Sequence, residues 1–385
     1  MKIQHKILLV CPSLENLGGT ELETIITSKI FLENNLAKKI TVFSPEEASK
    51  IIKSFSLQNE IVFENYPITF KNLFFLKLNY QLKKIFKLFN KDFSPIEYFY
   101  WLFHSFFNKY DFIYVVTDSS QFYYGPIIIN FNLSKVIFKF TTCFDYTNWN
   151  KLQKSIIKNS RAILVTASKQ KSFIESKFLV NNVKVVDVFI WNEEILGNIE
   201  IKKNKKFKFG MLCRISREKK IEDAIKIISN LRNFGHDICL YIKGPSIDNH
   251  YLEFLNKLII DLNVSDIVVL DTIPVLPLQI PYFYKEIDGF LITSIFEGGP
   301  NTGLECMAAG IPIISYDIGA MRERLKPFEE ILIADNFELL LEKANQLLSL
   351  NFDNYRRLRI NIKSHYNNCY NNELKLQNTI ALLSV

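Results

Sequence analysis

The sequence of 385 residues lacks any apolar run near the ~20 residues that a membrane-spanning helix requires. Its N-terminal apolar run, residues 7–10, is too short for a signal peptide and is interpreted as a first strand. None of the six cysteines forms a Cys-x-x-Cys pair, which indicates reduced thiols. These absences predict a cytoplasmic protein.

Metal-binding patterns are also missing. The five histidines show no metal-ligand spacing, and there is no Asp-x-Asp to hold a metal on a diphosphate. We therefore expect no metal and no cofactor. The net charge of +7 is modest and does not predict nucleic-acid binding. Because 48% of the residues are apolar, disorder is excluded and a sizeable core is expected.

Apolar strands alternate with helical patterns along most of the chain, which predicts α/β domains with parallel sheets. Expected strands are residues 6–10, 40–43, 111–116, 136–140, 162–166, 183–188, 207–212, 237–243, 267–270, 290–293 and 312–315. Expected helices include residues 20–34, 221–234, 337–350 and 355–370. A lysine-rich stretch closes residues 191–206, which we interpret as a linker.

The most informative segment is residues 294–312. After the strand at 290–293, Glu297 and the run Gly298-Gly299-Pro300-Asn301 have the composition of a loop. Leu304, Met307, Ala308 and Ile311 then recur at helical spacing, and Gly310 ends the helix. The segment therefore predicts a strand, a glycine loop, a short helix and another strand.

This arrangement has a chemical meaning. A helix N-terminus binds anions through its free N–H groups, but Glu297 and Glu305, placed in the loop and the first helical turn, would repel a bare phosphate. A nucleotide sugar suits both features, because its hydroxyls can donate to carboxylates while the N–H groups hold the diphosphate. Thr302 and Glu305 also match a capping box, in which Glu305 would only bond the helix start. On spacing alone both interpretations stay open.

Two further loops follow strands. Arg214 and Lys219 lie between the strand 207–212 and the helix 221–234, and two cations there would neutralise a diphosphate, although a solvated basic loop is the simpler interpretation. Gly18 and Gly19 open a helix after the first strand, where a plain tight turn is the alternative.

Residues 294–312 resemble the signature of the retaining family-4 (group 1 type) glycosyltransferases, which have the GT-B fold. Two glutamates eight positions apart, the intervening Gly-x-Pro-Asn and the following Glu-x-Met-Ala-x-Gly-x-Pro-x-Ile-x-Ser all match. The resemblance implies that Glu297 contacts the donor sugar and Glu305 the nucleotide ribose. It implies further donor contacts by Gly298, Gly299, Pro300, Asn301, Thr302, Gly303 and Leu304.

Weaker matches lie elsewhere. Arg214 and Lys219 resemble the family's Gly-Arg-x-x-x-x-Lys-Gly, with Cys213 and Lys220 in place of the glycines, which implies catalytic roles for both cations beside Glu297. Gly18 and Gly19 resemble the Gly-Gly-x-Glu loop that faces the donor phosphates. The family's histidine after the strand near residue 140 is missing, and Asp145 is the candidate for the acceptor side.

The implied fold is two Rossmann-like domains with parallel sheets facing across a cleft. We expect an acceptor domain at residues 1–190, the linker at 191–206, a nucleotide-sugar domain at 207–365, and a C-terminal helix at 366–385 that crosses back to the first domain. Ligands should lie at the carboxyl ends of the strands.

Residues 71–110 have an unusual composition. Residues 71–91 contain six lysines and no acidic residue, and aromatic residues are dense at 98–107. A basic amphipathic helix with aromatic neighbours suits an anionic membrane surface, and would place the protein peripherally at the inner face of the plasma membrane. A core-facing helix with a solvated lysine face is the alternative.

The sequence thus predicts a metal-independent, retaining glycosyltransferase. It would move a sugar from a UDP- or GDP-linked donor to a glycan or lipid-linked acceptor in assembling a surface glycan such as lipopolysaccharide or capsule. The missing histidine motivates one alternative, a catalytically silent partner that binds a nucleotide sugar and supports another transferase. An epimerase or phosphorylase of the same fold is a further alternative.

Overall fold

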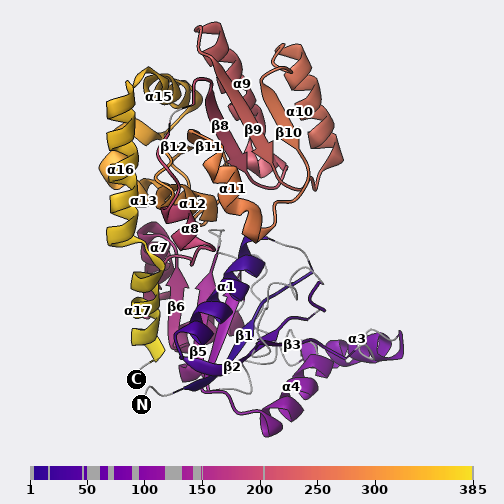
Figure 1. Ribbon diagram of the computed structural model, residues 1–385. Helices are drawn as coiled ribbons and strands as arrows, with labels where there is room; N and C mark the ends of the chain where they lie inside the picture. Colours follow the sequence, from indigo (N-terminus) through magenta and orange to yellow (C-terminus); the bar gives the residue numbers. More distant parts are fainter. Residues whose placement is uncertain are drawn as a thin grey trace. The chain divides into compact units, whose positions relative to one another are not determined.

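The computed structural model describes residues 4–15, 18–45, 47–49, 61–67, 73–88, 95–117, 132–141, 149, 151–202 and 204–383. The chain divides into two compact units (Figure 1). The first unit comprises residues 1–189 together with 378–385, and the second comprises residues 190–377. Each unit is built around its own sheet, in which every pair of neighbouring strands is parallel.

The sheet of the first unit has the order β3-β2-β1-β4-β5-β6-β7. Its strands are β1 (His5–Val10), β2 (Ala37–Phe43), β3 (Ile61–Glu64), β4 (Phe112–Thr117), β5 (Val136–Phe140), β6 (Ala162–Val165) and β7 (Val183–Val185). Its helices are α1 (Gly19–Glu33), α3 (Leu73–Leu88), α4 (Pro95–Phe107), η2 (Leu133–Lys135), α6 (Lys151–Asn159) and α7 (Ser168–Phe178). The central strands β4 and β5 are buried at every position, as expected of parallel strands covered on both faces.

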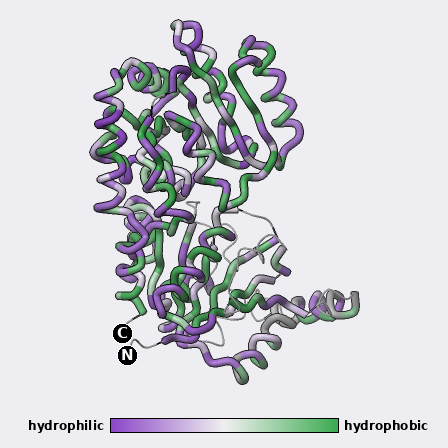
Figure 2. The backbone as a smooth tube through the Cα atoms, in the orientation of Figure 1, coloured by the Kyte–Doolittle hydropathy of each residue, from purple (hydrophilic) through white to green (hydrophobic). Residues whose placement is uncertain are grey.

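The sheet of the second unit has the order β10-β9-β8-β11-β12-β13. Its strands are β8 (Phe207–Leu212), β9 (Ile238–Lys243), β10 (Val268–Asp271), β11 (Gly289–Ile292), β12 (Ile313–Tyr316) and β13 (Ile333–Ala334). Its helices are α8 (Glu193–Gly197), η4 (Arg217–Lys219), α9 (Ile221–Asn233), α10 (Asn249–Asp261), η5 (Pro277–Gln279), α11 (Ile280–Lys285), α12 (Asn301–Ala308), α13 (Met321–Arg324), η6 (Lys326–Phe328), α14 (Glu329–Leu332), α15 (Phe337–Ser349) and α16 (Phe352–Cys369). Figure 2 shows the hydrophobic strands running through the interior of this unit.

The predicted fold class is confirmed: both units are α/β with a parallel sheet. Each predicted strand has a counterpart within two or three residues of the expected ends. The strands β3 and β13 were not predicted. β3 and β13 coincide with apolar runs of only three and four residues, at 61–63 and 331–334. Runs this short do not distinguish a strand from other buried segments.

The segments near the unit boundary are structured. Residues 191–206, expected to be a linker, contain α8, and Trp191 and Leu196 there are buried. α16 runs through residue 365 without interruption, and the final helix α17 (Asn372–Leu383) passes from the second unit into the first, at residue 378.

No helix within the described ranges is both long enough and apolar enough to cross a membrane. Cysteines in those ranges are free thiols: Cys11, Cys239 and Cys306 are buried, Cys213 is partly buried and Cys369 is exposed.

Candidate functional site

Two loops meet at the carboxyl edge of the second sheet because β8 and β11 are adjacent parallel strands, with Phe290 aligned to Gly210. The loop after β8 and the segment after β11 are joined by two hydrogen bonds. The hydroxyl of Thr293 donates to the carbonyl oxygen of Lys219 at 2.7 Å, and the N–H of Ile295 donates to the carbonyl oxygen of Glu218 at 2.9 Å. These bonds hold the loop after β8, which carries Arg214 and Lys219, against the glycine-rich loop after β11, which carries Glu297.

The two loops present an ion pair between Lys219 Nζ and Glu297 Oε1, and both side chains are 15% exposed. Burial lowers the pKa of Lys219, but attraction to Glu297 outweighs burial and leaves this pKa above its usual value. Lys219 is therefore a permanent cation. Beside the pair, burial raises the pKa of the Cys213 thiol to about 12, so Cys213 contributes no charge.

Arg214 joins this cluster through Glu218. Its guanidinium lies 3.7 Å from Glu218 Oε1, and the Ser216 hydroxyl donates to the same oxygen at 2.6 Å. Burial raises the pKa of Glu218, but the Ser216 hydroxyl and the nearby cations lower it below its usual value. Arg214 itself is more than half exposed and lies beside the partly buried Lys219–Glu297 pair, as a cation open to solvent.

Glu305 is buried inside the unit, and its Oε2 accepts a hydrogen bond from the Tyr284 hydroxyl at 2.7 Å. The expectation that Glu305 lies in the first helical turn is wrong. α12 begins at Asn301 after Pro300, so its first turn holds no acidic residue. The capping box of Thr302 and Glu305 is therefore not formed. Burial raises the pKa of Glu305 to about 7, although Tyr284 acts in the opposite direction.

Arginine side chains bond both ends of α12. Arg324 is buried, and its Nη1 donates to the carbonyl oxygen of Pro300 at 2.6 Å. At the other end, the buried Arg359 donates to the carbonyl oxygens of Gly310 and Ala309 at 2.9 and 3.2 Å. A cation suits a helix C-terminus, whereas at an N-terminus it adds to the positive potential of the helix dipole. The N-terminus of α12 is therefore strongly attractive to an anion.

Residues 192–365 match the family model described as glycosyl transferases group 1. This part of the chain is therefore similar to that family. The match covers α8 to most of α16 and so includes every residue of the cluster described above. The predicted resemblance is therefore confirmed.

Solved structures of similar fold span both units. TarM from S. aureus, in complex with UDP, is 14% identical; the match covers 99% of this chain and 100% of TarM, with a TM-score of 0.72. HepE from Anabaena, also in complex with UDP, is 13% identical, covers 98% and 99%, and has a TM-score of 0.72. A glycosyltransferase from Rickettsia africae is 15% identical, covers 99% and 98%, and has a TM-score of 0.70. These likenesses establish the GT-B fold. No curated protein sequence matches the chain significantly.

Within the matched residues 192–365, the predicted donor residues lie together on one strand–loop–helix unit. Gly298, Gly299 and Pro300 are buried in the loop, and Gly303 and Leu304 are buried in α12, whereas Asn301 and Thr302 are partly exposed. Glu305 lies on the same helix, but among the described residues no direct bond joins it to Lys219 or Glu297.

Other predicted site residues lie elsewhere or cannot be placed. Gly18 and Gly19 lie at the start of α1 in the first unit, so their role toward the donor stays a prediction. Asp145 lies outside the described residues. No group of three or more histidine, cysteine, aspartate or glutamate side chains suited to a metal ion occurs in the described part of the chain.

Sequence reasoning missed four residues of the candidate site: Glu218, Tyr284, Thr293 and Arg324. Tyr284 is 21 residues from Glu305, and Thr293 is 74 residues from Lys219. No local spacing signals such pairs. The order of parallel strands was the available signal for Thr293, because it places the end of β11 beside the loop after β8.

Proposed function

We propose that this protein transfers a glycosyl group from a nucleotide-diphosphate sugar to an acceptor hydroxyl, with retention of anomeric configuration and without a metal ion. The observation that carries the proposal is the partly buried Lys219–Glu297 ion pair at the carboxyl ends of β8 and β11. It places a fixed cation and a fixed carboxylate where ligands bind in open parallel sheets.

The charges of this site suit the two halves of such a donor. Lys219, Arg214 and the N-terminus of α12, reinforced by Arg324, would stabilise a diphosphate and the charge that develops as it leaves. Glu297 and Glu305 would accept hydrogen bonds from sugar and ribose hydroxyls. The leaving diphosphate would take the acceptor's proton, so the transfer needs no separate protein base.

Similar structures support the class of donor. TarM is described in complex with UDP and α-GlcNAc-glycerol, and HepE in complex with UDP-glucose. We infer a UDP- or GDP-linked sugar as donor for this chain. A glycan or lipid-linked acceptor in surface-glycan assembly, in lipopolysaccharide or capsule for example, fits the same chemistry.

The test is a screen of purified protein against UDP- and GDP-sugars, first by the rise in melting temperature that a ligand of the folded state produces, then by turnover with acceptor. Lys219→Ala and Glu305→Ala should each lower turnover by about 100-fold or more. Lys226→Ala, at an exposed position of α9, and Glu253→Ala, on α10, are the matched controls and should behave as the parent. Parental turnover in both Lys219→Ala and Glu305→Ala would show that the assigned site is wrong.

The same screen separates the alternatives. A donor that raises the melting temperature but yields no product with any acceptor would identify a catalytically silent binding partner. Conversion of a donor in the absence of acceptor would identify an epimerase. Formation of glycoside by the protein alone would exclude both.

We further propose that α3 and α4 contact an anionic membrane surface. On α4, Phe99, Phe103 and Phe107 recur at every fourth position and are 46–82% exposed. On α3, Phe74 and Tyr80 are exposed together with Lys77 and Lys84. α3 extends away from the body of its unit in Figure 1. Exposed aromatic side chains beside lysines are what an interfacial helix needs.

A further inference from the structure

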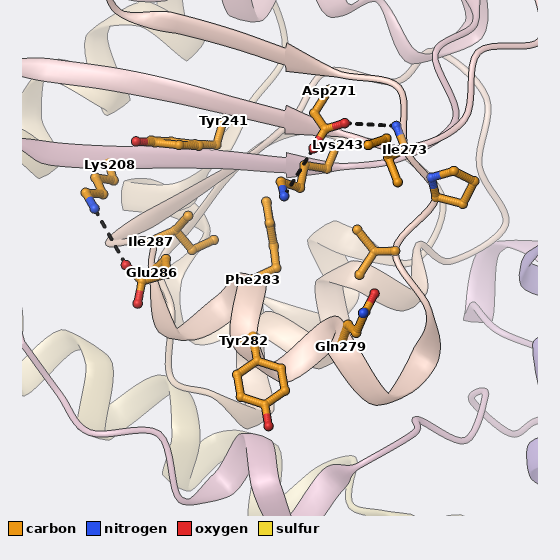
Figure 3. Close-up of a pocket in the computed structure, with 12 residues that line it drawn as sticks. Lys208, Tyr241, Lys243, Asp271, Ile273, Gln279, Tyr282, Phe283, Glu286 and Ile287 are labelled. Atoms are coloured by element: carbon orange, nitrogen blue, oxygen red, sulfur yellow. Dashed lines mark hydrogen bonds and ion pairs between the residues drawn. The ribbon is translucent and has the colours of Figure 1, made fainter.

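The second unit contains a pocket of about 470 Å³ on the face of its sheet, between β8–β10 and the segment that includes η5 and α11 (Figure 3). Its lining includes Lys208 near the start of β8 and Lys243 at the end of β9. The pocket therefore runs along the sheet rather than across its carboxyl edge. It shares no lining residue with the Lys219–Glu297 cluster.

The pocket exists because α11 covers only part of this face. Gly210, Tyr241 and Val269 are cross-strand partners and so point to the same side of the sheet. A Cβ on Gly210 would lie 2.7 Å from Ile287 Cδ1 and 2.9 Å from Phe283 Cζ, so the glycine lets the segment around α11 pack directly on β8. α11 has only six residues and does not cover the edge strand β10, where Val269 is 46% exposed. Tyr241, between them, forms the floor of the pocket.

An aromatic platform thus lies between two ion pairs. Lys208 Nζ lies 3.7 Å from Glu286 Oε2 at one end, and Lys243 Nζ lies 3.2 Å from Asp271 Oδ2 at the other. Figure 3 shows the Tyr241 ring edge-on along its strand, with one face turned toward the space above α11 and its hydroxyl directed toward the Lys208 end. Lys208 Nζ lies 5.7 Å from the centre of this ring.

The charges of the pocket favour a neutral ligand. Lys208 and Lys243 are matched by Asp271 and Glu286, so a charged ligand would have to displace an existing partner. The N–H of Ile273 donates to Asp271 Oδ1 at 2.9 Å and holds the pKa of Asp271 below its usual value. Asp271 is therefore an ionised acceptor with oxygen lone pairs that remain available. Each end of the pocket offers both charged donors and charged acceptors to a polyhydroxylated molecule.

We propose that this pocket is a carbohydrate-binding site for a neutral pyranose ring, separate from the donor site. The C–H bonds on one face of a pyranose would pack on the electron-rich face of Tyr241. Its vicinal hydroxyls would donate to Asp271 or Glu286 and accept from Lys243 or Lys208. The volume accommodates one or two such rings. The ligand is a residue of a glycan chain or a free sugar, which share this chemistry.

The proposal does not depend on the proposed transferase activity. In a transferase, however, such a site would hold part of a glycan near the catalytic domain and raise its effective concentration. Because Tyr282 and Glu286 in the lining are largely exposed to solvent, we expect millimolar affinity for single sugars.

The experiment uses the intact protein labelled at isoleucine methyl groups, because Ile273 and Ile287 line the pocket. The NMR spectrum is recorded with glucose, galactose, N-acetylglucosamine, cellobiose, lactose and N,N′-diacetylchitobiose. We expect at least one probe to shift the Ile273 and Ile287 methyl signals, assigned through Ile273→Val and Ile287→Val. The methyl group of Ile225, buried in α9, should not move. A disaccharide that binds more tightly than its monomer identifies a glycan chain as the ligand, and equal affinity identifies a single sugar.

Variants connect binding to the pocket. Tyr241→Ala and Asp271→Asn should each weaken binding roughly ten-fold, whereas Tyr241→Phe, which keeps the ring, should bind like the parent. Glu286→Gln changes an exposed side chain, 63% accessible, and tests the other end without disturbing the core. Unchanged affinity in both Tyr241→Ala and Glu286→Gln would overturn the proposal, as would the absence of binding by every probe.

Two further arms separate this site from the donor site. Saturating UDP should leave the sugar-induced shifts in place, and displacement of the sugar by UDP would overturn the proposal. Lys219→Ala should retain the shifts even if it loses turnover, so failure of the proposed function is distinguishable from failure of the pocket. Glucuronic acid should bind no more tightly than glucose, and a clear preference for the acid would contradict a neutral ligand.

Discussion

The Tyr284 hydroxyl donates a 2.7 Å hydrogen bond to Glu305 Oε2, and both side chains are buried. Tyr284 lies on α11 and Glu305 on α12, so the bond joins the helices that precede and follow β11 in the sequence. Burial raises the pKa of Glu305 to about 7 and that of Tyr284 well above its usual value. Tyr284 therefore stays a donor at neutral pH, while Glu305 lies near the midpoint of its titration.

The first prediction concerns stability against pH. Because the pKa of Glu305 rises from 4.5 to about 7 on folding, the folded state binds more protons in this range, and the free energy of unfolding falls as pH rises through it. Glu305→Gln has no carboxyl to ionise, so its free energy of unfolding should not fall in this pH range. Above neutral pH the variant should be more stable than the parent by on the order of 2–3 kcal/mol. Urea unfolding at several pH values measures it. Glu253→Gln on exposed α10 is the control, and parallel curves for Glu305→Gln and the parent would contradict the prediction.

The second prediction concerns Tyr284→Phe. The variant removes the bond that orients Glu305 and raises the pKa of the carboxyl further, because Tyr284 lowers it. Affinity for the donor nucleotide should fall by roughly ten-fold, in line with the loss of a hydrogen bond to a charged group. The affinity for the nucleotide should increase with pH as Glu305 ionises, and in the variant this increase should occur at higher pH than in the parent. Calorimetric titration with UDP or GDP across pH measures both. Tyr282→Phe, at an exposed neighbouring position, is the control.

Lys219 and Glu297 should act as a unit, which is the third prediction. Each single variant, Lys219→Ala or Glu297→Gln, leaves a partly buried group without its partner and should lower kcat/KM by about 100-fold or more. The double variant should lose much less than the product of the two losses, because the pair is coupled. Arg217→Ala, which removes an exposed side chain from the same loop, should retain activity. Strictly multiplicative losses would show that the two residues act independently.

A fourth prediction compares two glycines with positive φ. Gly319 has φ +54°, and a Cβ there would lie 2.5 Å from the carbonyl oxygen of Gly298, whereas at Gly235, with φ +89°, a Cβ meets open space. Gly235→Ala should cost about 1 kcal/mol of unfolding free energy from backbone strain alone. Gly319→Ala should cost more and weaken donor binding, because it displaces the loop that carries Glu297. Equal costs, with donor affinity unchanged in both, would show that this contact does not matter.

The fifth prediction tests membrane contact. Replacing Phe99, Phe103 and Phe107 together with serine should abolish co-sedimentation with anionic liposomes at low salt. Replacing Lys77 and Lys84 with glutamine should weaken it in a salt-dependent way. The control is Phe254→Ser, since Phe254 is comparably exposed on α10 in the other unit. Absence of co-sedimentation by the parent protein at low salt would end the proposal.

Much of the second unit could be predicted from the sequence. The strand bounds of β8 agree with the expected residues 207–212, and the run of glycines before α12 correctly marks a loop. Both follow from local patterns: a buried parallel strand is a continuous apolar run, and a loop collects glycine and proline. At the strands β3 and β13 the apolar runs have only three and four residues, too short to distinguish a strand from other buried segments, and both strands were missed.

By itself, the sequence determined the type and order of the elements, and with them the loops that would share one edge of the sheet. Only the tertiary structure decided which side chains pair there: Lys219 with Glu297, Arg214 with Glu218, and Glu305 with Tyr284 rather than with the start of its own helix. The physical reason is range. Helices and strands follow from neighbours a few residues apart, whereas an ion pair between residues 78 positions apart depends on the packing of the whole unit.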